Sequence, residues 1–132
     1  MANTGIIRNR LKINAAIINA KLFLKIAEQH GSFANFIWSY VDHSPIIGAW
    51  EKFEDVPVTT PISDRISKDL KKMGFKFVGS TIIYSFMQAV GMVNDHLRSC
   101  CVYEEILERQ SRAGKMEIFK NPNCKKVRGS HI

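Results

Sequence analysis

The chain has 132 residues, of which 45% are hydrophobic and 23% are charged, and its formal net charge is +7. This composition predicts one globular domain and excludes a disordered chain, a collagen-like chain and a disulfide scaffold. No apolar run approaches the roughly 20 residues that span a bilayer, and the start lacks a signal-peptide hydrophobic region. Three cysteines suit a reducing compartment, so we expect a cytoplasmic protein without membrane contact.

The positive charge is concentrated at the C-terminus, where residues 109–132 hold seven bases and one acid, while the remainder carries only +1. A basic tail by itself is weak support for a polyanion partner. The stretch from Arg65 to Lys76 is also basic and is a better candidate surface for an anion. We expect residues 1–110 to form the folded domain and residues 111–132 to form a basic, flexible tail.

Helical spacing of apolar residues predicts two helices in the first half of the chain. The first covers about residues 1–28 and ends at Gly31, and its wide apolar arc predicts burial on more than one face. Ser32 caps the second helix, which has the clearest amphipathic pattern in the sequence. In the connection to the third helix, we expect Trp50 and Phe53 to anchor on the core.

Three more helices are predicted in the second half. Thr60 is the expected N-cap of the third helix, with a proline at its first position, and Gly74 fits its left-handed C-cap. The fourth helix begins near Thr81. Asn94 or Asp95 is the expected cap of the last helix. Because no segment alternates like a strand for more than a few residues, the predicted architecture is all-α.

The corner between the third and fourth helices is the most informative segment. Gly74 and Gly79 allow a tight turn with positive φ, and the fourth helix begins directly after it with free N–H groups and a positive dipole end. Such a helix start is a site for one phosphate, although an ordinary αα-hairpin with a solvated basic face explains the pattern too. The side chains expected to pin the turn to the core are Phe75, Phe77 and Val78. The side chains expected to surround the site are Lys71, Lys72 and Lys76.

The stretch from Ser67 through Asp95 resembles the bacterial DNA-3-methyladenine glycosylase I family. Residues 5–13 and 36–41 look like two further segments of it, and the similarity covers about residues 5–101. The resemblance implies an all-α, helix-hairpin-helix DNA-glycosylase-like helical bundle that is incomplete, because only the C-terminal portion is present. It also implies a base-excision repair enzyme of the bacterial nucleoid. Such an enzyme flips 3-methyladenine out of alkylated double-stranded DNA and hydrolyses the N-glycosidic bond.

The resemblance assigns roles to particular residues of this chain. Ser85 matches a base-pocket position, although a helix serine bonded to a carbonyl one turn earlier is an equally good interpretation. His96 and Cys100, four apart on the predicted last helix, match half of a four-ligand structural zinc site. Without the family, a buried cysteine and a capping histidine would explain them better. The residues that match the family's phosphate clamp are Gly74, Phe75, Lys76, Phe77, Val78, Gly79 and Ser80.

The family's amino-terminal part has no counterpart in this sequence. That part carries the other two zinc ligands and the catalytic glutamate, and none of the seven glutamates here lies in the required motif. Related glycosylases use an aspartate at the position of Asn94, and an asparagine cannot act as a base. We therefore expect an inactive fragment that needs a second polypeptide for hydrolysis. The alternatives are a non-catalytic DNA-binding or interaction module and a remnant without function.

Overall fold

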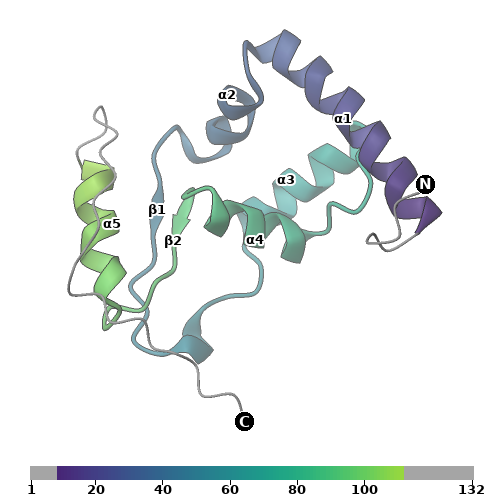
Figure 1. Ribbon diagram of the computed structural model, residues 1–132. Coiled ribbons are helices and arrows are strands. Elements are labelled where there is room, and N and C mark those ends of the chain that lie inside the picture. Colours follow the sequence, from purple (N-terminus) through teal and green to yellow (C-terminus); the bar gives the residue numbers. More distant parts are fainter. Residues whose placement is uncertain (1–8, 112–132) are drawn as a thin grey trace, which may run out of the picture. The chain divides into compact units, whose positions relative to one another are not determined.

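The computed structural model describes residues 9–111, and most of them are helical (Figure 1). The prediction of a mainly helical chain is confirmed. The helices are α1 (Arg10–His30), α2 (Phe33–Trp38), α3 (Pro61–Lys72), α4 (Ser80–Ala89) and α5 (Cys101–Ser111), with the 3-10 turns η1 (Ser39–Val41) and η2 (Phe53–Asp55). Two short strands, β1 (Ile46–Ile47) and β2 (Val93–Asn94), pair in a sheet that the sequence did not predict. Two residues are too few to show alternation.

The chain divides into two compact units. The first consists of the described residues up to Ile46 together with Pro57–Val93, and it contains α1 to α4. The second consists of Ile47–Val56 and the described residues from Asn94 onward, and it contains α5. Within residues 9–111, no helix combines the length and hydropathy needed to cross a bilayer. Residues 112–132 of the predicted tail lie outside the described part of the chain.

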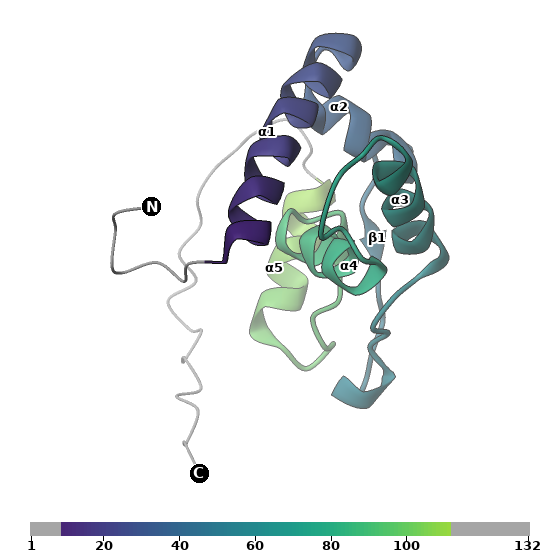
Figure 2. The same cartoon turned by 90° about the vertical axis from the view of Figure 1, so that its right-hand side faces the viewer.

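In the first unit, α1 begins at Arg10 because Asn9 caps it by accepting hydrogen bonds from the next turn. Gly31 ends the helix in the left-handed conformation, with φ 79°, as predicted, and the chain turns into α2 (Figure 2). The predicted burial of α1 on more than one face is wrong. Only Ala15 and Ile26 are buried, and the Leu24 side chain is 62% exposed.

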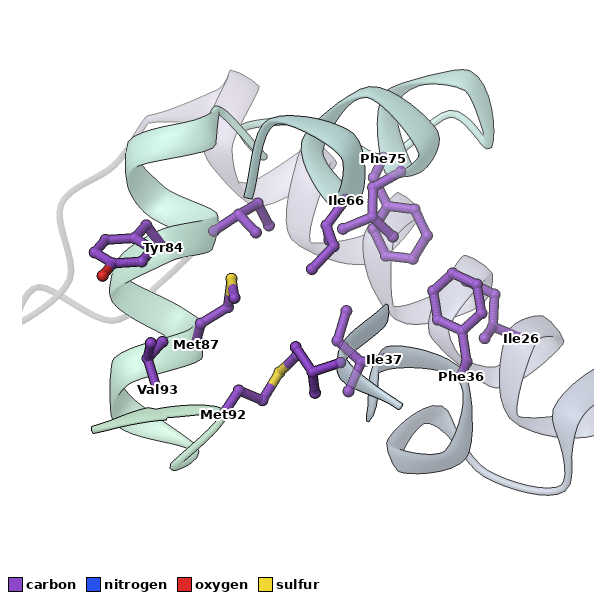
Figure 3. Packing of buried hydrophobic residues seen from close by; sticks show 12 residues of the cluster. Ile26, Phe36, Ile37, Ile66, Phe75, Tyr84, Met87, Met92 and Val93 are labelled. Carbon is purple, nitrogen blue, oxygen red and sulfur yellow. The ribbon is translucent and has the colours of Figure 1, made fainter. Parts of the chain in front are cut away.

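The core of the first unit is a single apolar cluster drawn from α1 to α4 and from the segment that follows α4 (Figure 3). Ile66 of α3, Met87 of α4 and Met92 are completely buried within it. Phe36 of α2 stacks edge-on against Tyr40 at 5.6 Å between ring centroids. This packing fixes α3 against α4 and so determines how the loop between them, residues 74–79, is presented.

The second unit is held together by a small polar network. The Trp50 indole donates a 2.8 Å hydrogen bond to the Asp95 carboxylate, and the buried Tyr103 hydroxyl donates to the Gly48 carbonyl. Because Asp95 is engaged in this way and Asn94 pairs with Gly48 in the strand ladder, neither caps a helix. The predicted start of the last helix is therefore wrong, since α5 begins only at Cys101. Phe53 is 81% exposed, so its predicted role as an anchor is also wrong.

Candidate nucleic-acid interface

Helix α3 begins and ends as the sequence predicts. Thr60 and Ser63 form a reciprocal capping box at its start, and the Gly74 backbone reaches φ 98° after its last turn. Gly79 was also expected to need positive φ, but it has φ −63° and ψ 157°, an ordinary extended conformation. Phe77 takes the left-handed conformation instead, with φ 57°. The turn therefore depends on a strained phenylalanine rather than on its second glycine.

Side chains of α1 and α3 hydrogen-bond to the backbone of the 74–79 loop, in addition to the bonds of the Gly74 and Phe75 N–H groups to α3 carbonyls. The Ser67 hydroxyl donates to the Val78 carbonyl at 2.6 Å from the buried face of α3. On the opposite side, the Asn19 carboxamide of α1 accepts from the Lys76 N–H and donates to the Lys76 carbonyl, both at 2.9 Å. No sequence pattern indicates the Asn19 contact, because the two residues are 57 positions apart.

Side chains of the loop divide between core and solvent. Phe75 is buried and Val78 packs against the core, as predicted. Phe77 is 55% exposed, so it does not pin the loop to the core. The left-handed backbone of Phe77 directs its side chain outward. The sequence prediction assumed negative φ at this residue, as is usual for a phenylalanine, and so placed the side chain on the core.

The first turn of α4 is open to an anion. Within residues 9–111, no hydrogen bond is made to the backbone N–H groups of Ser80, Thr81 or Ile82. Gly79 provides no capping side chain, and a Cβ placed on it would meet nothing within 4 Å. These N–H groups and the positive helix end together make a suitable position for one phosphate oxygen.

One carboxylate lies next to this turn without occupying it. Asp64 of α3 accepts a hydrogen bond from the Ser80 hydroxyl. The Oγ of the buried Ser63 lies 2.8 Å from the Ser80 Oγ. The bond joins side chains and leaves the Ser80 backbone N–H open. The start of α4 is therefore braced by α3 through side chains, while its first backbone N–H groups have no hydrogen-bond partner within residues 9–111.

The cations expected around the site are present and accessible. Lys71, Lys72 and Lys76 are all exposed. Lys72 lies 3.9 Å from the Asp69 carboxylate, and this exposed ion pair is weak. Residues 60–80 contain five bases and two acids, so the surface around the loop is locally positive. Such a surface attracts a phosphodiester backbone without reading its sequence.

Ser85 makes the hydrogen bond that its alternative interpretation requires. Its exposed hydroxyl donates to the Thr81 carbonyl at 3.1 Å, one turn earlier in α4. A serine bonded in this way can still line a base pocket, so the base-pocket role stays a prediction. The bond itself shows only that Ser85 is compatible with an ordinary helix position.

The two candidate zinc ligands lie together in the second unit, although not on a helix. His96 and Cys100 are in the connection that leads to α5, and their Nδ1 and Sγ atoms are 3.8 Å apart. Two ligands of a tetrahedral zinc ion are separated by about 3.5 Å, so the pair fits half of such a site. Among the described residues, no group of three or more His, Cys, Asp or Glu side chains is placed to hold a metal.

Asn94, which the resemblance places where related glycosylases use an aspartate, is buried in the second unit. Its side chain is 2% exposed, and its Oδ1 accepts a 3.3 Å hydrogen bond from the His96 N–H. An amide has no titratable proton in the physiological range, so this buried group cannot activate water. This residue thus supplies no general base.

An apolar groove of about 570 Å³ lies on the first unit. Exposed side chains of α1 and α4, including Phe23, Leu24 and Ile82, form part of its wall. The wide apolar arc of α1, from which burial on more than one face was predicted, was the sequence signal for this groove. The groove is lined by Asn19, Ala20, Phe23, Leu24, Phe33, Ile37, Leu70, Phe75, Val78, Ile82, Ile83 and Phe86.

Solved structures of 3-methyladenine DNA glycosylase I share this arrangement of helices. The Staphylococcus aureus protein, whose structure explains its recognition of 3-methyladenine, aligns with a TM-score of 0.74 and 36% identity over 78% of this chain and 55% of its own. Another 3-methyladenine DNA glycosylase I structure aligns with a TM-score of 0.70 and 54% identity, over 76% and 56%. The mainly helical fold is thus that of part of a DNA glycosylase.

A sequence model of the methyladenine glycosylase family matches residues 1–103, and the chain belongs to this family. DNA-3-methyladenine glycosylase 1 of Escherichia coli (strain K12) is 50% identical over 101 residues. DNA-3-methyladenine glycosylase of Haemophilus influenzae is 45% identical over 100 residues. Each match covers 76% of this chain and 54% of the relative. The predicted resemblance is confirmed, and the chain spans about half the length of these relatives.

Proposed function

We propose that this chain is the DNA-gripping part of a base-excision repair glycosylase that acts on 3-methyladenine in alkylated double-stranded DNA. Helix α3, the 74–79 loop and α4 serve as its helix-hairpin-helix element. The segment from Gly74 to Ser80 forms the phosphate clamp through the N–H groups that follow Lys76, since those of Gly74, Phe75 and Lys76 are bonded within the first unit. The observation that carries this proposal is the open first turn of α4, where three N–H groups lack partners within residues 9–111. Ser85 would line the pocket for the flipped base.

The grip depends on preorganised donors rather than on proton transfer. A phosphodiester oxygen accepts hydrogen bonds from the N–H groups of the first α4 turn, and the positive helix end favours its charge. Because Gly79 has no side chain, the phosphate can approach the backbone closely. The exposed lysines add a salt-dependent attraction that carries no sequence information. Flipping of the base costs a few kcal/mol and is easier for a damaged base.

Hydrolysis of the N-glycosidic bond needs groups beyond those described in this chain. The buried amide of Asn94 cannot act as a base, and the chain matches only 54% of the E. coli relative. We therefore propose a second polypeptide that supplies the other part of the family fold. The apolar groove on the first unit supports this proposal, because exposed apolar surface of this kind marks interaction sites.

Replacement of Gly79 by valine tests the grip. The backbone of Gly79 suits any residue and a Cβ there meets nothing within 4 Å, so valine fits the protein itself. It would instead obstruct an approaching phosphate, and we expect duplex DNA to bind at least ten-fold more weakly at fixed salt. The measurement is fluorescence anisotropy with a labelled duplex across a salt series, because backbone binding weakens as salt rises.

Ala34→Val is the control, since it also introduces a valine, at an exposed position of α2. The control should bind DNA as the unmodified protein does. If Gly79→Val also binds unchanged, the 74–79 loop is not the site, and the basic segment beyond α5 becomes the better candidate.

A non-catalytic DNA-binding module is the second candidate function. The buried amide at Asn94 favours it, because this side chain cannot serve as a general base. The two candidates differ in one respect. If the chain is part of a glycosylase, 3-methyladenine should be released once the complementary polypeptide is added. If it is a non-catalytic module, it should bind DNA but release no base, with or without that polypeptide.

We also propose that His96 and Cys100 hold half of a structural zinc site. The 3.8 Å separation of their Nδ1 and Sγ atoms supports this, and a bound zinc would tie the connection before α5 to two further ligands. Metal analysis of the purified chain, compared with His96→Ala, tests the proposal. We expect the variant to contain less zinc. Equal zinc in the two proteins would remove the site.

A further inference from the structure

Asn19 joins α1 to the loop that lies between α3 and α4. Its carboxamide makes two hydrogen bonds to the backbone of Lys76. It accepts one from the Lys76 N–H and donates one to the Lys76 carbonyl, both at 2.9 Å. A pair of bonds to one residue fixes both the position and the orientation of the backbone there. Both bonds are exposed, so water can replace either of them if Asn19 is removed.

The bond from Ser67 fixes the loop two residues further on. The Ser67 hydroxyl holds the Val78 carbonyl at 2.6 Å, so Lys76 and Val78 are anchored from different helices. Only Phe77 connects these anchors, and it does so with φ 57°. A non-glycine residue in this conformation is disfavoured and persists where its surroundings enforce it. Asn19 and Ser67 thus hold the two residues that flank the strained Phe77, in the turn that leads to Gly79 and α4.

We infer that Asn19 is a positioning residue, which holds the 74–79 loop in its DNA-binding conformation before DNA arrives. The inference rests on the proposed grip of the phosphodiester by this loop. Without Asn19, Phe77 can relax toward negative φ. The loop would then sample conformations in which it obstructs the approach of a phosphate to the first N–H groups of α4. Apparent affinity falls in proportion to the population of the competent conformation. The effect should therefore appear in binding more than in folding.

The test compares Asn19→Leu with Asn35→Leu in the full chain. Leucine has nearly the shape of asparagine and a higher helix propensity, so α1 should be preserved. Asn35 is an exposed asparagine of α2 whose carboxamide donates to the His30 carbonyl, away from the loop. We expect Asn19→Leu to weaken duplex DNA binding roughly ten-fold. Asn35→Leu should change binding less than two-fold, and both should shift the melting temperature by similar small amounts.

Amide hydrogen exchange and chemical shifts measured by NMR without DNA provide a second readout. In Asn19→Leu, the Lys76 amide should exchange much faster, and the shifts of residues 76–80 should move, while Asn35→Leu leaves them unchanged. Unaltered exchange and shifts in Asn19→Leu would overturn the inference whether or not DNA binds. An altered loop with unchanged DNA affinity would overturn it as well.

The Gly79→Val variant separates failure of this inference from failure of the proposed grip. If Asn19 acts through the loop, the double variant should bind little worse than Gly79→Val alone, since both changes affect one contact. Additive losses would overturn the positioning role. If Gly79→Val binds DNA normally, the proposed grip fails, and the NMR comparison alone decides whether Asn19 sets the loop conformation.

Discussion

Tyr40 shows how a single side chain couples the turn after α2 to α3. Its hydroxyl donates a 3.0 Å hydrogen bond to the Asp69 carboxylate, and the Arg65 guanidinium lies 5.7 Å from the centre of its ring. Burial, and then the hydrogen bond and negative charge of Asp69, raise the pKa of Tyr40 from 10.0 to about 12, while Arg65 partly opposes the shift. The folded protein therefore holds this proton more tightly than the unfolded chain does.

Stability should fall in alkaline solution for this reason. The contribution of Tyr40 is fully present below pH 10, and it is lost as the pH rises toward about 12, because the unfolded chain releases the proton first. Tyr40→Phe has no proton to lose, so we expect its free energy of unfolding to depend less on pH across this window. Urea unfolding at several pH values, with tyrosinate absorbance as a direct titration, makes the measurement. Parallel pH profiles for the two proteins would contradict the assignment.

Residues that depend on contacts distant in sequence are the ones that the sequence could not assign. Gly48 is an example, because a Cβ there would lie 2.2 Å from the Trp50 indole nitrogen and 2.7 Å from an Asp95 oxygen. Asn19 is another, since its partner is 57 positions away. Conversely, Gly74 was assigned correctly because the left-handed helix end is a local property.

At the scale of elements, local signals determine most helix boundaries. Ser32 and Thr60 cap their helices through bonds to the following turn, as the sequence predicted. The last helix was placed too early because Asn94 and Asp95, both good caps, are engaged by partners almost fifty residues away. His96 and Cys100 nevertheless lie together, as predicted, although a turn rather than helical spacing brings them close. The candidate site was thus found with a wrong local geometry.

The candidate clamp combines predictable and unpredictable elements. Its two flanking helices and their glycines follow from sequence periodicity and caps. The strained Phe77, the Ser67 bond to Val78 and the Asn19 contact follow from tertiary packing. Without the packing, the segment is an ordinary helical turn. With it, the Lys76 N–H and the Val78 carbonyl are held by α1 and α3, while the first N–H groups of α4 have no hydrogen-bond partner within residues 9–111.

At the scale of the whole molecule, the exposed apolar groove and the partial coverage of the relatives both support the proposed second polypeptide. On α1, Phe23 is 44% exposed and Leu24 is 62% exposed, and both line the 570 Å³ groove. The chain matches 54% of the E. coli relative. A partner segment that covers the groove would bury apolar side chains worth about 1.5–3 kcal/mol each. Association with that segment should therefore stabilise the chain.

The complementation experiment uses the part of the E. coli relative that this chain does not match. Alone, the 132-residue chain should release no 3-methyladenine from alkylated DNA, because hydrolysis needs groups supplied by that second polypeptide. Together, the two should co-purify and release the base.

Leu24→Lys places a charge in the groove and should weaken the complex at least ten-fold, since an unpaired charge is costly to bury. Leu11→Lys, at another exposed position of α1 that does not line the groove, should leave the complex unchanged. Appreciable release by the chain alone would show that it carries its own catalytic groups, and equal loss in both variants would place the partner elsewhere.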